Sequence, residues 1–222
     1  MLTTSVDTIG NVVEARLSLT HDEHATFVWR VKLISWLSLA FMCVEAVVGV
    51  YAGVAASSIA LIGWGIDSMI EGVASLVVIW RFTGERIHSD NAEGTAQKVV
   101  AVSFFLLAPY VAVEATRQLI TGTEPKASWI GIILALSSIV FMPLFGYAKK
   151  RIGNKLSSPA TAGEGTQNIL CAYLSVAILV GLAANALAGW WWADPLVALL
   201  VAVVAVQAGL RTWRGEACDD GC

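Results

Sequence analysis

The chain has 222 residues, of which 57% are hydrophobic and 14% are charged, and its mean hydropathy is +0.70. Soluble domains usually carry about 25% charged residues, so this composition excludes a protein that exposes most of its chain to water. The net charge of −3, with no basic run beside an aromatic platform, also excludes a nucleic-acid partner.

Six apolar stretches are long enough to cross a bilayer, which takes about 20 residues for roughly 30 Å of hydrocarbon. In chain order they are expected at 32–54, 58–80, 97–120, 128–148, 165–189 and 194–211. The two longest polar connections are expected at 81–97 and 149–167. We expect a cytoplasmic arm over 1–31 before the spans and a cytoplasmic tail over 212–222 after them, without a soluble C-terminal domain. The predicted fold class is therefore an all-α membrane protein with six transmembrane helices.

Lysine and arginine predict the orientation of these spans, because they are enriched in cytoplasmic loops. Twelve of the fourteen basic residues fall on the side of both termini, and only Arg117 and Lys126 fall opposite. Trp190, Trp191 and Trp192 stand together at the outer end of the fifth span, where amphipathic rings favour the interface. We therefore expect a multi-pass protein of the plasma or inner membrane with both termini in the cytoplasm.

Two acids in the second span are the most informative residues, since an ionisable side chain near the bilayer centre costs at least about 2.5–3.5 kcal/mol. Asp67 and Glu71 stand four residues apart, so both carboxylates lie on one face of the helix. Two like charges repel there unless one is protonated or a cation lies between them. A structural polar cluster is the alternative reading. The pair predicts a bound divalent cation, because two buried acids on one face are costly scaffolding.

The fifth span supplies further donors. Gln167 and Cys171 are also one turn apart, so an amide oxygen and a thiolate can join the carboxylates in a four-ligand site for a borderline metal. A cysteine in a membrane helix is also a common small packing residue. Ser175, one turn further on, either adds an oxygen to the site or bonds its own helix backbone.

Two acids in other spans have simpler readings. Glu45 in the first span is an acid that supports the metal ligands without touching the ion, a proton carrier or the partner of a polar group, and the sequence leaves these three roles open. Glu114 lies near the outer end of the third span, and Arg117 follows three residues on. That spacing predicts a local ion pair.

Both ends of the chain carry a short ligand-rich stretch. His21 and His24 precede the first span, and Cys218 and Cys222 follow the last. Both stretches are expected on the cytoplasmic side, where they either collect metal or remain solvated polar tails. The second reading is favoured, because a few residues without a fold bind metal weakly.

The acid pair lies in a segment that resembles part of a known protein family. The run from Ser58 to Ser75 resembles the second transmembrane helix of cation diffusion facilitators, which carries two metal ligands four residues apart, an Asp or His and then an Asp. Asp67 and Glu71 fall on those two positions. Glu71 is a conservative departure from the family's second ligand.

A second segment supports the resemblance. GWWWADPLVALLVA, residues 189–202, looks like the loop and sixth helix of the same family. Counting back by the family's usual spacing places Cys171 where the family has an Asp and Gln167 where it has a His. The likeness runs from about residue 30 to 211 and includes the EPKASWIGIILAL connection and the basic KKRIGNKLSSPA loop. A small-tail branch, similar to the transmembrane-protein-163-like relatives of the family, fits best. The resemblance implies a cation-efflux-type bundle, a homodimer, alternating access and exchange of metal for protons.

Together these features predict a secondary transporter that exports a divalent transition metal by proton antiport. A thiolate favours zinc, cadmium or copper(I), whereas carboxylates with an amide suit manganese or iron(II); zinc is the first choice. The metal is cargo, and no permanently bound cofactor is expected. The alternative is a non-transporting metal sensor or partner subunit that kept the fold. An enzyme is not expected, because all three histidines lie outside the spans.

Overall fold

The residues that the structure describes form six α-helices. The computed structural model describes residues 21–55, 59–122, 129–190 and 192–216, and no strand occurs within these ranges. In chain order the elements are α2 (His21–Ala55), α3 (Ile59–Arg81), the short 3-10 helix η1 (Gly84–His88), α4 (Asp90–Thr121), α5 (Trp129–Lys155), α6 (Pro159–Ala188) and α7 (Ala193–Arg214). The predicted all-α fold class is confirmed.

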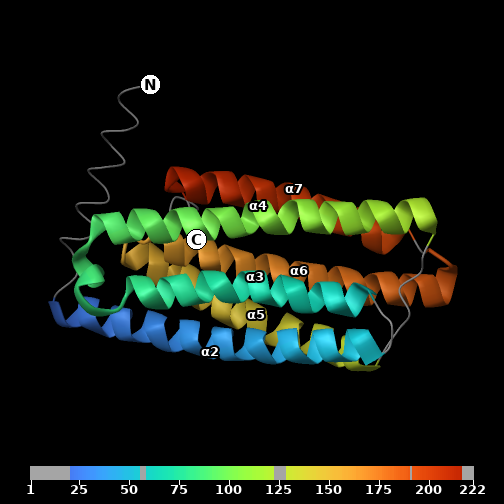
Figure 1. Ribbon diagram of the computed structural model, residues 1–222, viewed down its shortest axis with the longest axis horizontal. Helices are drawn as coiled ribbons and strands as arrows, with labels where there is room; N and C mark the ends of the chain where they lie inside the picture. The colour runs from blue at the N-terminus through green and yellow to red at the C-terminus, as the bar shows by residue number, and fades with distance from the viewer. Residues whose placement is uncertain (1–20, 56–58, 123–128, 191, 217–222) are drawn as a thin grey trace, which may run out of the picture.

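The helices have the dimensions of membrane spans. By length and composition, α2, α4 and α5 contain apolar stretches that can cross a bilayer. The other three, α3, α6 and α7, have 23, 30 and 22 residues, and at about 1.5 Å per residue each exceeds roughly 30 Å. All six run alongside one another in a single bundle (Figure 1). This is the architecture of a six-helix membrane protein.

The helices extend beyond the predicted spans at one end of the bundle. The first begins at His21 rather than near residue 32, and α4 begins at Asp90 rather than near residue 97. The connections expected at 81–97 and 149–167 shrink to 82–89, which contains η1, and 156–158. The predicted spans are shorter because hydropathy identifies only the part of a helix that faces lipid. The helical hydrogen bonds of the backbone continue into the polar turns beyond that part.

We call this end of the bundle the basic end. It holds the starts of α2, α4 and α6 and the ends of α3, α5 and α7, including Arg81, Lys155 and Arg214 (Figure 1). At the opposite end the rings of Trp190 and Trp192 stack with centroids 6.0 Å apart; Trp191 lies outside the described residues. That the basic end faces the cytoplasm stays a prediction.

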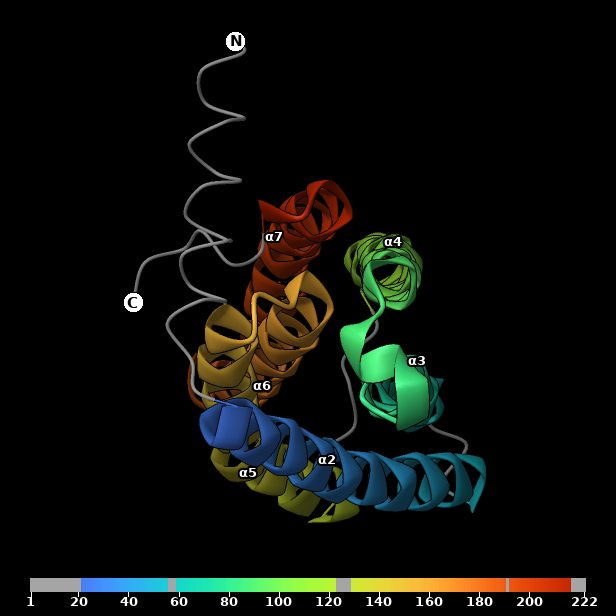
Figure 2. The same ribbon diagram turned by 90° about the vertical axis from the view of Figure 1, so that its left-hand side faces the viewer.

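Neighbouring helices pack in pairs, α2 with α3, α5 with α6 and α4 with α7. Figure 2, which looks along the bundle, shows α3 and α4 on one side and α6 opposite them. Gly146 and Gly165 let α5 and α6 approach closely, because a Cβ on either would lie 2.7 or 2.6 Å from the other's carbonyl oxygen. Such small-residue contacts are typical of membrane helices. They fix the depth and rotation of α6, which carries Gln167 and Cys171.

Candidate metal centre

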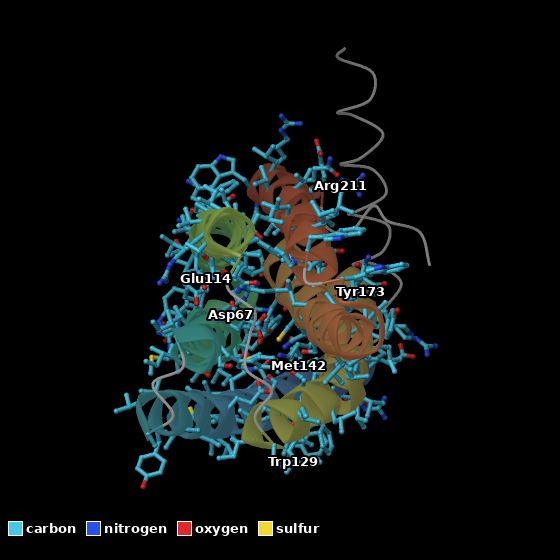
Figure 3. All side chains as sticks on the ribbon, turned by 90° about the vertical axis from the view of Figure 1, so that its right-hand side faces the viewer. Asp67, Glu114, Trp129, Met142, Tyr173 and Arg211 are labelled. Carbon is cyan, nitrogen blue, oxygen red and sulfur yellow. The ribbon has the colours of Figure 1, made fainter. Side chains whose placement is uncertain are left out.

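Three of the predicted ligands meet in the interior of the bundle. Asp67 and Glu71 of α3 and Cys171 of α6 each offer a ligand atom, and these atoms all lie within 4.8 Å of one another. Figure 3 shows Asp67 in the middle of the bundle, with Met142 of α5 nearby. Glu71 and Cys171 are 1% and 4% exposed, whereas Asp67 is half-buried. In the ranges that the structure describes, no other three His, Cys, Asp or Glu residues approach so closely.

Close contact between α2 and α3 positions the acid pair. A Cβ on Gly65 would lie 2.6 Å from Val50 Cγ2 and 2.9 Å from the Ala46 carbonyl oxygen. Only glycine therefore fits at this crossing, two residues before Asp67. Because α3 is pressed onto α2 here, the opposite face with Asp67 and Glu71 is directed toward α6.

Three of the four carboxylate oxygens of Asp67 and Glu71 lack a hydrogen-bond partner in the described residues. Within the described residues, Asp67 Oδ1 and both carboxylate oxygens of Glu71 are buried and accept no hydrogen bond. The other buried side-chain atoms of this kind there are Gln167 Nε2 and Asn154 Oδ1. A buried acceptor left unpaired costs about 1–3 kcal/mol, and more when it is charged. A cation between the carboxylates removes that penalty for three oxygens at once.

The fourth predicted ligand, Gln167, is engaged elsewhere. Its Oε1 accepts a hydrogen bond from Ser103 Oγ of α4 at 3.0 Å, and its buried Nε2 has no partner in the described residues. An amide rotated by 180° would donate to the same hydroxyl and leave Oε1 unpaired instead. Gln167 therefore has a donor or an acceptor to spare, one turn from Cys171.

A hydrogen-bonded chain links Glu45 of α2 to the thiol. Ser138 of α5 donates to Glu45 Oε1 at 3.0 Å and lies 3.7 Å from Cys171 Sγ. Ser68 of α3 donates to the other carboxylate oxygen of Glu45, at 3.5 Å. Of the three roles open to Glu45, this geometry corresponds to the partner of polar groups. Through Ser138, the Glu45 carboxylate is one hydroxyl group away from the thiol of Cys171.

Two other residues have local partners. Ser175 Oγ donates to the Cys171 carbonyl oxygen at 2.9 Å, so its hydroxyl is bonded to its own helix. Glu114 pairs with Arg117, with 3.6 Å between Oε2 and Nη1. The predicted local ion pair is confirmed.

A buried cation that the sequence pattern does not predict lies near the site. Lys149 of α5 is 0% exposed, and its Nζ donates to Glu164 Oε1 at 2.7 Å and to Asn168 Oδ1 at 3.1 Å, both on α6. Ser38 of α2 and Ser75 of α3 complete the set of acceptors. We call these five residues the lysine cluster, and together they join four helices. The cluster lies on the basic-end side of Glu71, because Ser75 follows Glu71 by one turn of α3. Lys149 had been expected in a cytoplasmic loop.

Two methionines were also missed. Met42 of α2 and Met142 of α5 are 1% and 0% exposed and belong to one packed cluster with Cys171. Asn168 Nδ2 donates to Met142 Sδ at 3.2 Å. The side chain of Cys171 therefore packs with two methionines as well as lying close to the carboxylates of α3.

The ligand-rich ends are only partly described. His24 of α2 stacks on His88 of η1 with ring centroids 5.9 Å apart. The side chain of His21, and both Cys218 and Cys222, lie outside the described residues. Whether these stretches collect metal stays an open expectation.

Comparison with known proteins places the chain among metal-related membrane proteins. Residues 31–215 match the cation efflux transmembrane domain. The chain is 22% identical over 180 residues to transmembrane protein 163 of Xenopus laevis, covering 80% of this chain and 64% of that protein. It is 28% identical over 167 residues to the magnetosome protein MamB of Magnetospira sp. (72% and 57%). It is 22% identical over 165 residues to an uncharacterized transporter of Synechocystis sp. (71% and 53%). The chain thus spans between about half and two thirds of the length of these relatives.

Proposed function

Since the chain belongs to the cation efflux family, we propose that it is a secondary transporter of a divalent transition metal, with zinc as the first candidate. The ion leaves the cytoplasm in exchange for protons, by alternating access, and the working unit is a homodimer. Asp67, Glu71 and Cys171 hold the ion as cargo, and Gln167 is the fourth ligand. Glu45 supports these ligands from the adjacent helix.

One observation carries this proposal. Three carboxylate oxygens of Asp67 and Glu71 are buried without a hydrogen-bond partner in the described residues, within reach of a thiol that comes from another helix. A structural polar cluster satisfies its own members, as the lysine cluster does, because buried polar groups are almost always paired. An acid pair that stays unpaired beside a sulfur ligand is what a transient cation site requires.

The donor atoms support a borderline metal. Zinc accepts both thiolate and carboxylate ligands, whereas manganese and magnesium prefer oxygen alone. Met42 and Met142 pack with Cys171, so the thiol has polarizable neighbours. Zinc and cadmium are therefore favoured over manganese, and the carboxylates on α3 supply the negative charge that a divalent ion needs.

Proton exchange follows from the chemistry of the ligands. Carboxylates and a thiol bind metal in their deprotonated forms, so metal binding releases protons and metal departure takes them up. Asp67 and Glu71 are the proton-exchanging pair, because like charges this close repel once the cation has left. Each transport cycle thus moves metal and protons in opposite directions.

The layout of the bundle supports alternating access. On the basic-end side of Glu71, the lysine cluster joins α2, α3, α5 and α6 through buried hydrogen bonds. Asp67, one turn further from the basic end, is half-buried. We infer that the lysine cluster acts as a polar plug toward the basic end, and that Lys149 changes partners in the opposite state of the cycle.

A second candidate is a metal sensor or partner subunit that does not transport. Gln167 favours it, because its amide already bonds Ser103 and a neutral amide is a weak metal ligand. Such a protein keeps the fold and the three-residue site but binds metal without releasing it across the membrane.

Metal-stimulated proton flux in vesicles that contain the purified protein separates the two candidates. We would compare zinc, cadmium, manganese, iron(II) and cobalt, with Asp67→Ala and Cys171→Ala beside wild type. A transporter gives flux with zinc or cadmium that both variants lose. Flux that persists unchanged in Asp67→Ala would contradict the proposed site. Saturable zinc binding without flux in folded protein would support the sensor.

A further inference from the structure

A hollow separate from the metal centre opens at the basic end of the bundle. It has a volume of about 660 Å³ and lies between the first turns of α2, η1 and the turn from α5 to α6. Ligand pockets in proteins typically measure about 300–1,000 Å³. The hollow is therefore large enough for a small molecule or for the polar end of a lipid.

The hollow combines apolar walls with a cationic rim. Val28, Phe82 and Leu156 line it with apolar side chains, and Lys32 and Lys155 line it with ammonium groups. No carboxylate of the described ranges forms an ion pair with either lysine. Lys155 instead lies over the ring of Phe27, with its Nζ 4.8 Å from the centroid. Lys32 is half-buried and Lys155 is exposed, and two such cations without a counter-charge create a site for an anion.

The other charged lining residues lower this positive charge only through Asp90. Arg81 also lines the hollow, but its charge is neutralised by Glu93, whose Oε2 lies 2.7 Å from Arg81 Nε. His24 and His88 stack on one another along the same wall. Asp90 is the one carboxylate among the residues that line the hollow. The lining therefore stays net positive through Lys32 and Lys155.

The hollow lies at the depth of lipid headgroups. Trp29 lines it and is 63% exposed, and tryptophan is enriched where the hydrocarbon meets the headgroups. Lys32 is at the start of the apolar part of α2, and Arg81 is the last residue of α3. A molecule bound here contacts the headgroup layer on one side and the protein on the other.

We propose that this hollow binds the headgroup of an anionic phospholipid from the leaflet at the basic end. Its phosphate pairs with Lys32 and Lys155, and its glycerol and upper acyl carbons lie on Val28, Phe82 and Trp29. Basic pockets between membrane helices bind anionic lipids in this way. A free phosphate makes no use of the apolar walls, and an acidic peptide would leave the membrane-facing Trp29 uncovered. A lipid in this position bridges α2, η1 and the α5–α6 turn.

Lipid retention by the full-length protein tests this proposal. Detergent-purified protein is titrated with phosphatidylglycerol or with phosphatidylcholine of the same acyl chains, and bound lipid is counted by native mass spectrometry. Wild type should retain phosphatidylglycerol in preference. Each of Lys32→Gln and Lys155→Gln should weaken that binding by roughly fivefold, and the double variant by more. Lys98→Gln is the matched control, because Lys98 is an exposed lysine near the same end that does not line the hollow.

Further arms identify the occupant. Lys32→Arg and Lys155→Arg should keep the preference, since they keep the charge. Unchanged retention of phosphatidylglycerol in the double Gln variant, or equal retention of both lipids by wild type, overturns the proposal. Displacement of the lipid by millimolar inorganic phosphate reassigns the site to free phosphate. Carbodiimide can also cross-link Lys32 directly to an acidic residue of segment 1–20. If that cross-link forms equally well with and without lipid, the hollow is reassigned to the chain's own N-terminal segment.

Discussion

Lys149 and Glu164 form an ion pair inside the bundle, with 2.7 Å between Nζ and Oε1 and side chains that are 0% and 1% exposed. The second carboxylate oxygen of Glu164 accepts a hydrogen bond from Ser35 at 3.2 Å. All of these groups are satisfied, unlike the carboxylates of the metal centre. The bundle thus contains two charged clusters next to each other, one whose polar groups are paired and one with three buried carboxylate oxygens that have no hydrogen-bond partner in the described residues.

Replacing Lys149 with methionine should destabilise the protein by about 3–5 kcal/mol, because Glu164 would stay buried without a counter-charge. The free energy of unfolding is measured by mixed-micelle denaturation followed by tryptophan fluorescence. Lys149→Met with Glu164→Gln should recover most of the loss, since no lone charge remains. Lys98→Met, an exposed lysine on α4, should change stability by no more than about 0.5 kcal/mol. A double variant as unstable as Lys149→Met would show that the pair is not what stabilises this region.

The sequence predicts where the membrane helices lie better than it predicts which polar side chains meet between them. Apolar length locates each membrane helix, and the four-residue spacing of Asp67 and Glu71 places them on one face without any structure. Lys149 is missed because it follows an apolar span inside a basic run, where lysine usually lies in water. Its burial depends on Glu164 and Asn168, and nothing local in the sequence brings those residues beside it.

One signal for the missed residues does exist in the sequence. Ser35, Ser38, Met42 and Glu45 recur at intervals of three and four along the first span, which is one face of a helix. This stripe faces the interior, where Ser38 meets Lys149 and Glu45 meets Ser138. The partners themselves cannot be read from one chain, because helix rotation and depth depend on contacts such as Gly146 with Gly165.

Bound zinc should protect Cys171 from thiol reagents. A variant that keeps Cys171 as its one cysteine is labelled with N-ethylmaleimide, and zinc at ten times its Kd should slow the reaction by about tenfold through occupancy alone. Asp67→Asn in this background should remove the protection. Cys43, exposed on α2, serves as the control in a matching variant and should react equally fast with and without zinc. Labelling of Cys171 that ignores zinc would exclude the thiol from the site.

Ser138→Ala should weaken zinc binding by about 10–100-fold, the usual effect of removing a group that orients a ligand. Ser138 links Glu45 to Cys171, so its loss frees both side chains. Isothermal titration with zinc measures the change. Ser137→Ala is the matched control, because Ser137 donates to the Leu134 carbonyl oxygen on its own helix and should leave the affinity unchanged. Equal losses in both variants would point to a general disturbance of α5.

Zinc uptake driven by a pH gradient tests the central claim most directly. Vesicles with inward-facing and outward-facing protein are loaded at one pH, diluted into zinc at another, and assayed for accumulated metal. Glu71→Gln removes one carboxylate of the site, whereas Glu114→Gln removes an acid paired with Arg117 outside it. We predict zinc uptake in wild type and in Glu114→Gln. In Glu71→Gln, zinc uptake should fall by at least about 100-fold, because losing a group that only supports a ligand already costs up to about that factor. Equal uptake in Glu71→Gln and wild type would contradict the account.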